Sequence, residues 1–471
     1  MKKKLIAGIM ALCLMLSPLT SFAKGETPNP NAHAPEIAYS DSLYENGEIA
    51  SEAKVTFEYN KNEQEKPSFY PRIGCAAAFL ADPVSSKIFY EKDAYEKRYP
   101  ASTTKILTAL LVLENCKTDE MVKVSQEDID AVPSGYSTAN LQAGEELSVY
   151  TMLQALLIPS ANEAANSLAR HVSGSIEAFA DLSNKRAKEL GCETLHFVNP
   201  NGVHDKNHYC SAYDLYLIAR ECQKYDVFNE IVKTKSFTVP ATDIYKKEDR
   251  TYSNTNALLL PSSEHYYDAC TGIKTGHTSP AGECLVSSSY KNNLNLICVV
   301  LGGKIAPNGI NERFYDSKKL FEYAYNNYEY KQIADKSKTI EKLEVENAKD
   351  ESVILNAVIQ TDINAVAPND LTQYNVVTKI KMAPEIKAPI KKGQVLGTIT
   401  YKVDGLNYTT NIVADSDVAK KPFWLYNLLF VLGVAILLIA VYIIFNKVVK
   451  KKRKANRKKS RESNEDKNDD E

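Results

Sequence analysis

The chain has 471 residues, of which 44% are hydrophobic and 25% charged, and its formal net charge at pH 7 is −2. This length exceeds what one ordinary hydrophobic core supports, so we expect two or three domains. The composition is that of a globular protein, and the near-neutral charge gives no reason to expect a nucleic-acid partner.

The N-terminus has the pattern of a secretory signal peptide. A basic start, Lys2 to Lys4, precedes a short apolar stretch, Ile6 to Leu16, and a small residue stands at Ala23 where signal peptidase would cut. The apolar stretch is short for a membrane span, which disfavours an uncleaved anchor. We therefore expect residues 1–23 to be removed and the polar, proline-containing residues 24–71 to form a spacer with little fold of its own.

Residues 72–330 are predicted to form an α+β domain, in which helices pack on an antiparallel sheet. An early hairpin is expected from CAAAFLAD and KIFYEK, and later strands from CTGIKTGHT, GECLVSSSY and LNLICVVLGG. Helices are expected at about 102–116, 148–158, 162–173, 175–190 and 309–326.

The remainder of the chain changes character twice. Residues 331–418 contain short β-branched segments and glycine turns, which predict a small all-β domain. Residues 425–445 carry no charge and are long enough for a transmembrane helix. Residues 446–471 begin with a basic block and end acidic, so the positive-inside rule predicts a cytoplasmic tail and an extracytoplasmic location for the domains before the span.

The cysteines and histidines suggest no metal site. Eight cysteines remain after the signal peptide, without paired spacing or a CxxC motif, and several, such as Cys298, lie in apolar runs. Buried free thiols are therefore favoured over disulfides. The seven histidines are scattered and form no HxxxH or HExxH pattern, so neither a metal nor another cofactor is expected.

A serine and a lysine three residues apart begin the first predicted helix. Pro100 stands where a helix starts, Ser102 lies at its positive end, and Lys105 shares a helix face with Ser102. The residues after Lys105 are apolar on nearly all sides, so its amine is predicted to be poorly solvated. Desolvation lowers an amine pKa and makes the lysine a possible base for a serine nucleophile. The alternative is an ordinary helix cap with an exposed lysine.

The pattern Ser-x-x-Lys is weak evidence alone, because it occurs again at Ser288 and Lys291. That second copy lies on a predicted strand leading into a turn, where residues i and i+3 point to opposite faces. Only the first copy is predicted to lie on a buried helix.

Two further motifs follow in the chain. Ser160 and Asn162 flank the corner that Pro159 forces between two helices, where helix capping is the simpler interpretation. Lys274, Thr275, Gly276 and His277 lie on a predicted strand, where the glycine would let a ligand approach the edge. The alternative to a ligand-binding role for these four residues is an ordinary edge strand exposed to solvent.

Taken together, the three motifs are the signature of penicillin-binding proteins and serine β-lactamases. The chain resembles the low-molecular-mass penicillin-binding proteins of the serine D-Ala-D-Ala carboxypeptidase type. The resemblance is strong over about 72–326 and rests also on Phe197-Val-Asn-Pro-Asn-Gly202, Ser211-Ala-Tyr-Asp214 and the stretch from Lys274 to Gly282. A full membrane span departs from the family's usual amphipathic surface anchor.

The resemblance implies a role for each motif residue. Ser102 would attack the carbonyl of the penultimate D-alanine of a peptidoglycan stem peptide, with Lys105 accepting its proton. Ser160 would help to protonate the leaving D-alanine and Asn162 would orient the peptide. Lys274 and Thr275 would bind the terminal carboxylate along the Gly276 edge, and the backbone N–H groups of Ser102 and His277 would form the oxyanion hole. A β-lactam would acylate Ser102 in the same way.

Three alternatives stay open at this point. A β-lactamase of the same fold needs a fast deacylating base, for which the sequence offers no convincing match. A D,D-endopeptidase or transpeptidase would use the same residues with another substrate or acceptor. A non-catalytic wall-binding sensor would be expected to lack Ser102, Lys105 or Lys274, and all three are present.

Overall fold

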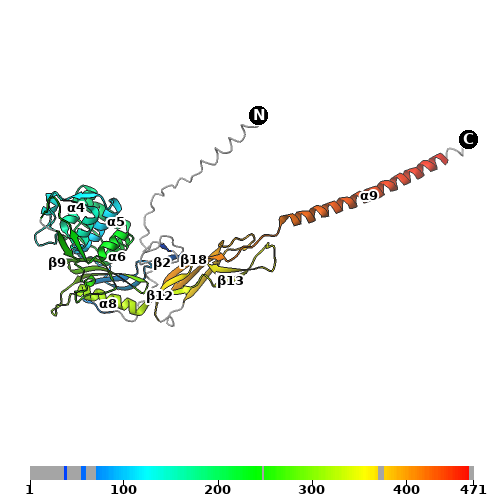
Figure 1. The fold of residues 1–471 in the computed structure, drawn as a ribbon. Coiled ribbons are helices and arrows are strands. Elements are labelled where there is room, and N and C mark those ends of the chain that lie inside the picture. The colour runs from blue at the N-terminus through cyan, green and yellow to red at the C-terminus, as the bar shows by residue number, and fades with distance from the viewer. Residues whose placement is uncertain (1–36, 40–54, 60–70, 247–248, 370–375, 466–471) are drawn as a thin grey trace, which may run out of the picture.

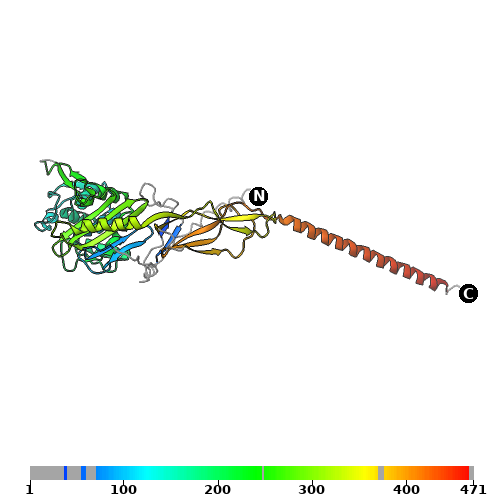
Figure 2. The ribbon, with the colours of Figure 1, turned by 90° about the horizontal axis from the view of Figure 1, so that it is seen from below.

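The computed structural model describes residues 37–39, 55–59, 71–246, 249–369 and 376–465. The predicted signal peptide and most of the predicted spacer lie outside the described residues. A larger α+β domain, a smaller all-β domain and one long helix follow one another along an extended molecule (Figures 1 and 2). The predicted fold class is confirmed.

A five-stranded antiparallel sheet forms the centre of the larger domain, in the order β4-β3-β11-β10-β9. Its strands are β3 (Ala77–Ala81), β4 (Ile88–Lys92), β9 (Cys270–Thr278), β10 (Gly282–Lys291) and β11 (Leu294–Gly303). The predicted early hairpin is formed by β3 and β4, and the predicted later strands are β9, β10 and β11. Strand β3 pairs with β11, which closes the domain across more than 200 residues of sequence.

Both faces of this sheet are covered, which explains why its strands are apolar almost throughout. Along β11, Ile297 and Val299 pack into the core beneath the helices of one face, whereas Cys298 and Val300 pack on the other side. Successive strand residues point to opposite faces, so a strand buried on both sides reads as a continuous apolar run. The second face is covered by α8 (Glu312–Asn327), as Figure 2 shows.

The other face carries a helical layer (Figure 1). Its elements are η2 (Ala101–Thr104), α1 (Lys105–Asn115), α2 (Gln126–Asp130), α3 (Val149–Leu157), α4 (Asn162–Ser173), α5 (Ile176–Glu189), α6 (Ala212–Cys222) and α7 (Asp226–Lys233). Helices α2, α6 and α7 were not predicted. The short pairs β5 (Met121–Lys123) with β6 (Glu146–Ser148) and β7 (Ser236–Val239) with β8 (Arg250–Ser253), and η3 (Ala257–Leu259), complete the domain.

The start of α6 shows how its sequence specifies a helix. The Ser211 hydroxyl accepts a hydrogen bond from the backbone N–H of Asp214, and the Asp214 carboxylate accepts one from the backbone N–H of Ser211. This capping box satisfies two N–H groups that the first turn of a helix leaves without partners. It lies in the stretch from Ser211 to Asp214 that supported the family resemblance.

The smaller domain consists of two antiparallel sheets around one apolar core. Its strands are β12 (Tyr328–Ala334), β13 (Thr339–Glu344), β14 (Ile354–Ile359), β15 (Ile363–Pro368), β16 (Val377–Met382), β17 (Val395–Val403) and β18 (Leu406–Ala414). Inward-facing side chains alternate along them, such as Ile399, Tyr401 and Val403 on β17.

Two strands from the predicted spacer extend this smaller domain. They are β1 (Ile37–Tyr39) and β2 (Val55–Tyr59), and β2 pairs with β18 through Phe57 opposite Tyr408. The expectation of a spacer with little fold of its own therefore needs a correction. An extended segment without its own hydrophobic core can still form a strand by pairing with an existing sheet edge.

A buried ion pair joins the two domains. Lys87, just before β4, lies 2.7 Å from Asp404, which forms the turn between β17 and β18, and each side chain is 2% exposed. The ring of Tyr328, at the start of β12, packs against Phe89 of β4. Since a buried charge needs a close partner of opposite sign, this pair fixes how the two domains meet.

The chain continues from the smaller domain into α9 (Phe423–Glu465), which extends away from the rest of the molecule (Figures 1 and 2). Among the described residues, one helix is long and apolar enough to cross a membrane, and it covers Asn427–Arg461 within α9. The basic block after residue 446 continues the same helix. The domain boundaries drawn from the sequence stay predictions.

The eight cysteines that follow the predicted signal peptide are all free. Seven are buried and Cys116 is partly exposed. The prediction of free thiols is confirmed, with Cys116 as the member that is not buried.

Candidate active site

The predicted nucleophile lies on a tight turn that leads into a buried helix. Pro100 caps η2, and α1 continues from Lys105 without interruption. Ala101 has a positive φ of 48°, an uncommon conformation for a residue other than glycine. Ser102 is partly exposed, whereas the Lys105 side chain is fully buried. The serine hydroxyl is thus accessible above an amine that water does not reach.

The amine of Lys105 contacts three oxygen atoms. Its Nζ is 3.1 Å from Ser102 Oγ and 2.8 Å from Asn162 Oδ1. The third partner is the backbone carbonyl of Asn201, at 2.5 Å. The amide of Asn162 is oriented because its Nδ2 donates to the carbonyl of Ser137 at 2.8 Å, which leaves Oδ1 facing the lysine.

The surroundings of Lys105 favour its neutral form. Burial lowers the pKa of Lys105 well below its ordinary value of 10.5, and the positive charge of Lys274 lowers it further. The nearby carboxyl of Glu163 acts in the opposite direction but does not outweigh them. The predicted buried, poorly solvated lysine is therefore present in the structure.

Ser160 and Asn162 lie where Pro159 was expected to break the helices, between the end of α3 and the start of α4. Neither caps α4, because Ala161 occupies the cap position and no side chain bonds to the first turn. Ser160 has a positive φ of 69°, and its buried Oγ has no hydrogen-bond partner among the described residues. Strained backbone and an unsatisfied buried hydroxyl are both features that point to function.

The third motif runs along edge strand β9. Lys274 is buried, and its Nζ donates to the carbonyl of Thr275 at 3.0 Å. Burial, and secondarily the charge of Arg313, lower the pKa of Lys274 to about 7. The hydroxyl of Thr275 is 2.6 Å from that of Thr255. Lys274 also interacts electrostatically with Lys105, so β9 and the start of α1 face the same site.

At Gly276, β9 lies close to the turn of residues 100–104, which is called the nucleophile turn below after the predicted role of Ser102. A Cβ atom at this position would lie 2.8 Å from the carbonyl oxygen of Pro100 and 3.1 Å from the backbone nitrogen of Ser102. A side chain would therefore separate β9 from η2. The sequence predicted a glycine needed for close approach; the partner that the structure provides is the nucleophile turn itself.

His277 points away from this contact and is exposed, with Nδ1 2.9 Å from the carboxylate of Glu283. The second oxygen of Glu283 is 2.7 Å from Arg313, and Arg313 also donates to the carbonyl of Gly276 at 3.1 Å. This network fixes the end of β9. The sequence did not identify Glu283 and Arg313, because a strand residue and a helix residue 30 positions apart carry no shared pattern.

The sequence analysis also did not identify His208 and Thr104, which hold the turn that carries Ser102 through hydrogen bonds. The His208 ring accepts a hydrogen bond from the backbone of Val198 on Nδ1, so its Nε2 carries the proton and donates to Thr104 Oγ1 at 2.8 Å. Thr104 in turn donates to the carbonyl of Ala101. Burial lowers the pKa of His208 to about 3, so the ring stays neutral. This chain of bonds holds the strained turn beneath Ser102.

Glu163 supports the site from the other side. One of its oxygens accepts a 2.6 Å hydrogen bond from the backbone N–H of Ala139, in the loop that also provides the Ser137 carbonyl for Asn162. Burial raises the pKa of the Glu163 carboxyl. A single charged residue that follows Asn162 forms no motif, so this role had no signal in the sequence.

The second Ser-x-x-Lys copy behaves as expected of a chance match. Ser288 is buried on β10 and its hydroxyl bonds to that of Thr271 at 2.7 Å. Lys291, at the end of the same strand, is exposed. The two side chains form no site.

An accessible serine above a buried lysine, at the junction of an antiparallel sheet and a helical layer, defines a serine hydrolase of the penicillin-binding fold. The chain belongs to the D-alanyl-D-alanine carboxypeptidase family, which residues 60–305 match. Residues 328–420 match the C-terminal domain of penicillin-binding protein 5. The resemblance stated from the motifs is thereby confirmed.

Individual proteins agree with this assignment. The chain is 34% identical to D-alanyl-D-alanine carboxypeptidase DacF of Bacillus subtilis, over 73% of this chain and 84% of the relative. Among solved structures, a peptidoglycan synthesis regulatory factor, PBP3, of Streptococcus pneumoniae superposes with a TM-score of 0.62 at 25% identity, over 74% of this chain and all of the other. Penicillin binding protein 5 of Haemophilus influenzae superposes with a TM-score of 0.57 at 27% identity, over 75% of this chain and 100% of the other.

A substitution at Gly202 tests how tightly the nucleophile turn is held. Gly202 has a φ of +82°, and a Cβ there would lie 1.9 Å from the carbonyl oxygen of Ala101. Gly202→Ala should lower the free energy of unfolding by about 2 kcal/mol or more, since the left-handed conformation and a backbone overlap both oppose the methyl group.

The matched control is Gly174→Ala, because Gly174 has a φ of +80° but a Cβ atom added there would have nothing within 4 Å. In this variant the free energy of unfolding should fall by only about 1 kcal/mol, the cost of placing alanine in the left-handed conformation. Denaturant unfolding of both proteins gives the comparison. Equal losses would show that the contact between Gly202 and the nucleophile turn is not tight.

Proposed function

We propose that this enzyme removes the terminal D-alanine from peptidoglycan stem peptides that end in D-Ala-D-Ala, through an acyl-enzyme formed on Ser102. The observation that carries the proposal is the set of partners around Lys105 Nζ. Two of the three, Asn162 Oδ1 and the Asn201 carbonyl, can only accept hydrogen bonds. The third, the Ser102 hydroxyl, lies 3.1 Å away and can either accept a hydrogen bond or donate one.

A neutral amine matches these three partners. It has two N–H bonds, which the two obligate acceptors would use, and one lone pair, which would accept the hydroxyl proton of Ser102. A charged ammonium would have to donate to all three and could accept no proton. Burial disfavours the charged form as well. Lys105 is therefore poised as the general base that activates Ser102.

The reaction then proceeds in two halves. Lys105 takes the proton of Ser102, whose Oγ attacks the carbonyl carbon of the bond between the two D-alanines, while backbone N–H groups of Ser102 and His277 stabilise the oxyanion. The C–N bond breaks, and the leaving amine takes a proton that Ser160 helps to deliver. Water then hydrolyses the ester on Ser102, which releases the shortened peptide and restores the hydroxyl.

Lys274, Thr275 and Asn162 are proposed to orient the substrate. The buried charge of Lys274 and the hydroxyl of Thr275 would bind the terminal carboxylate, and the amide of Asn162 would position the peptide. A carboxylate that follows the scissile bond is common to a D-Ala-D-Ala peptide and a β-lactam. We therefore propose that β-lactams acylate Ser102 and inhibit the enzyme.

Substituting the two serines of the Ser-x-x-Lys copies tests the nucleophile. The wild-type chain in detergent should release D-alanine from a stem pentapeptide and bind labelled penicillin covalently. Ser102→Ala should abolish labelling and lower the rate of release at least ~1000-fold, because no other group takes its place. Ser288→Ala should keep both activities, since Ser288 lies on β10.

The outcomes separate the remaining possibilities. Labelling of Ser102 without release of D-alanine would replace the carboxypeptidase with a transpeptidase, an endopeptidase or a sensor. Labelling that persists in Ser102→Ala would refute the assigned nucleophile.

The pH profile tests the two lysines separately. The ratio kcat/KM should rise with pH as Lys105 loses its proton, because the base must be neutral. It should fall as pH increases beyond about 7, because Lys274 has a pKa of about 7 and binds the carboxylate only while charged. Lys274→Arg should move the falling limb to a much higher pH, since an arginine stays protonated.

The control for this profile is Lys291→Arg, at the exposed lysine of the second motif copy, which should leave the whole curve unchanged. The shape of the curve, rather than the absolute rate, is the readout. A falling limb that stays at the same pH in Lys274→Arg would contradict the role of Lys274.

We also propose a topology. Residues 1–23 would direct export, α9 would cross the membrane once, and its basic continuation would stay in the cytoplasm, so that both folded domains face outward. Protease added to intact cells without an outer barrier should digest the two domains and leave a C-terminally tagged fragment protected until detergent is added. Digestion of the tag in intact cells would refute this orientation.

A further inference from the structure

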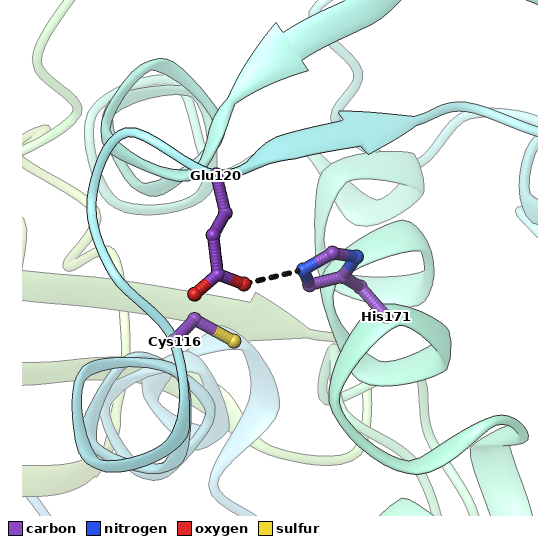
Figure 3. Close-up of side chains that lie close together, drawn as sticks. All are labelled: Cys116, Glu120 and His171. Carbon is purple, nitrogen blue, oxygen red and sulfur yellow. Dashed lines mark hydrogen bonds and ion pairs between the residues drawn. The ribbon is translucent and has the colours of Figure 1, made fainter.

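Three side chains with metal-binding atoms converge on the larger domain, away from the active site. They are Cys116 at the end of α1, Glu120 in the connection to β5, and His171 in the last turn of α4 (Figure 3). Their ligand atoms all lie within 4.8 Å of one another. No two of these residues are spaced as in a common metal-binding motif, so the cluster could not be predicted from the sequence.

The cluster is oriented as a site would need. His171 Nε2 is 3.2 Å from Glu120 Oε2, and the thiol of Cys116 points into the same space (Figure 3). The other oxygen, Glu120 Oε1, accepts a 2.8 Å hydrogen bond from the backbone N–H of Lys117. That bond fixes the carboxylate and leaves Oε2 directed at the histidine. A ligand held in place by an outer hydrogen bond is typical of metal centres.

From this arrangement we propose that Cys116, Glu120 and His171 bind one zinc ion, with water as the fourth ligand. A thiolate, an imidazole nitrogen and a carboxylate oxygen are the three donor types that Zn²⁺ takes in proteins, at bond lengths of about 2.0–2.3 Å. The ion would replace the contact between His171 Nε2 and Glu120 Oε2, so the three side chains would rotate to bring their ligand atoms to these distances. Cys116 and Glu120 are partly exposed and His171 is exposed, so water reaches the remaining position.

The charges at the cluster balance those of a divalent cation. On binding, Cys116 would release its thiol proton to solvent, and His171 would bind through Nε2 with its proton on Nδ1. One thiolate and one carboxylate then neutralise the ion. The C-terminal ends of α1 and α4 both lie here, and the negative ends of two helix dipoles add to the attraction for a cation.

The position of the cluster gives the ion a structural role. Helices α1 and α4 run side by side in the same direction. At their beginnings, Lys105 Nζ lies 2.8 Å from Asn162 Oδ1. At their ends, the side chains of Cys116 and His171 belong to the same cluster. The length of α1 separates the two sites by roughly 16 Å. The ion would clamp the ends of the two helices that bring the base and its amide partner together, without contacting substrate.

Cobalt(II) provides a direct test, because it occupies zinc sites and a cobalt–thiolate bond gives a charge-transfer absorption band. The full chain, purified in detergent with its thiols reduced and then stripped of metal, should bind one equivalent of Co²⁺ with this band, and Zn²⁺ should displace it. Cys116→Ser should eliminate the band, and His171→Ala and Glu120→Gln should each weaken binding at least ten-fold.

A second readout and a control complete the design. Zn²⁺ should raise the melting temperature of the wild-type chain by several degrees and that of His171→Ala by much less. His265→Ala removes a histidine that pairs with Glu264, and it should bind Co²⁺ like the wild type. The proposal is overturned if folded wild-type protein shows no band, if the band survives in Cys116→Ser, or if His171→Ala and Glu120→Gln bind as tightly as the wild type.

Discussion

The amine of Lys105 is the group on which the site depends. It is fully buried, and its three partners come from three separate parts of the chain: the nucleophile turn, the start of α4 and the backbone at Asn201. Burying an amine without satisfying it would destabilise the domain by several kcal/mol, so these segments must meet around it. The same contacts place its Nζ 3.1 Å from Ser102 Oγ. Packing and proposed chemistry are therefore two consequences of one arrangement.

The rest of the larger domain holds that arrangement from both sides. On one side, β9 approaches the nucleophile turn at Gly276 and carries the second buried lysine of the site, Lys274, whose charge further lowers the pKa of Lys105. On the other side, α1 and α4 run in parallel and bring Lys105 and Asn162 together. The strained Ala101 is held through Thr104 and the neutral ring of His208. Strain at a reactive residue persists only where its surroundings enforce it in this way.

The features that could be predicted from the sequence are those that depend on residues close together in the chain. Motif spacing on a buried helix predicted that Ser102 and Lys105 lie together, and apolar runs predicted the central strands and the apolar helix α9. The sequence did not predict interactions that depend on backbone atoms or on distant partners. The contact between Lys105 and the backbone carbonyl of Asn201 does not depend on the residue type at 201, so the sequence does not indicate it. The pairing of β2 with β18 joins segments some 350 residues apart. Cys116 and His171 likewise become neighbours only through the packing of α1 on α4.

The central claim is that Lys105 is a neutral amine in the resting enzyme, and a direct titration tests it. Nuclear magnetic resonance of chains labelled with ¹³C at lysine Cε follows the protonation of each amine, and Lys105→Met identifies the relevant signal by its disappearance. We predict that the Lys105 signal titrates well below the ordinary lysine pKa of 10.5, apart from those of the exposed lysines. A Lys105 signal that titrates together with the exposed lysines would contradict the account, because a permanently charged ammonium could not accept the proton of Ser102.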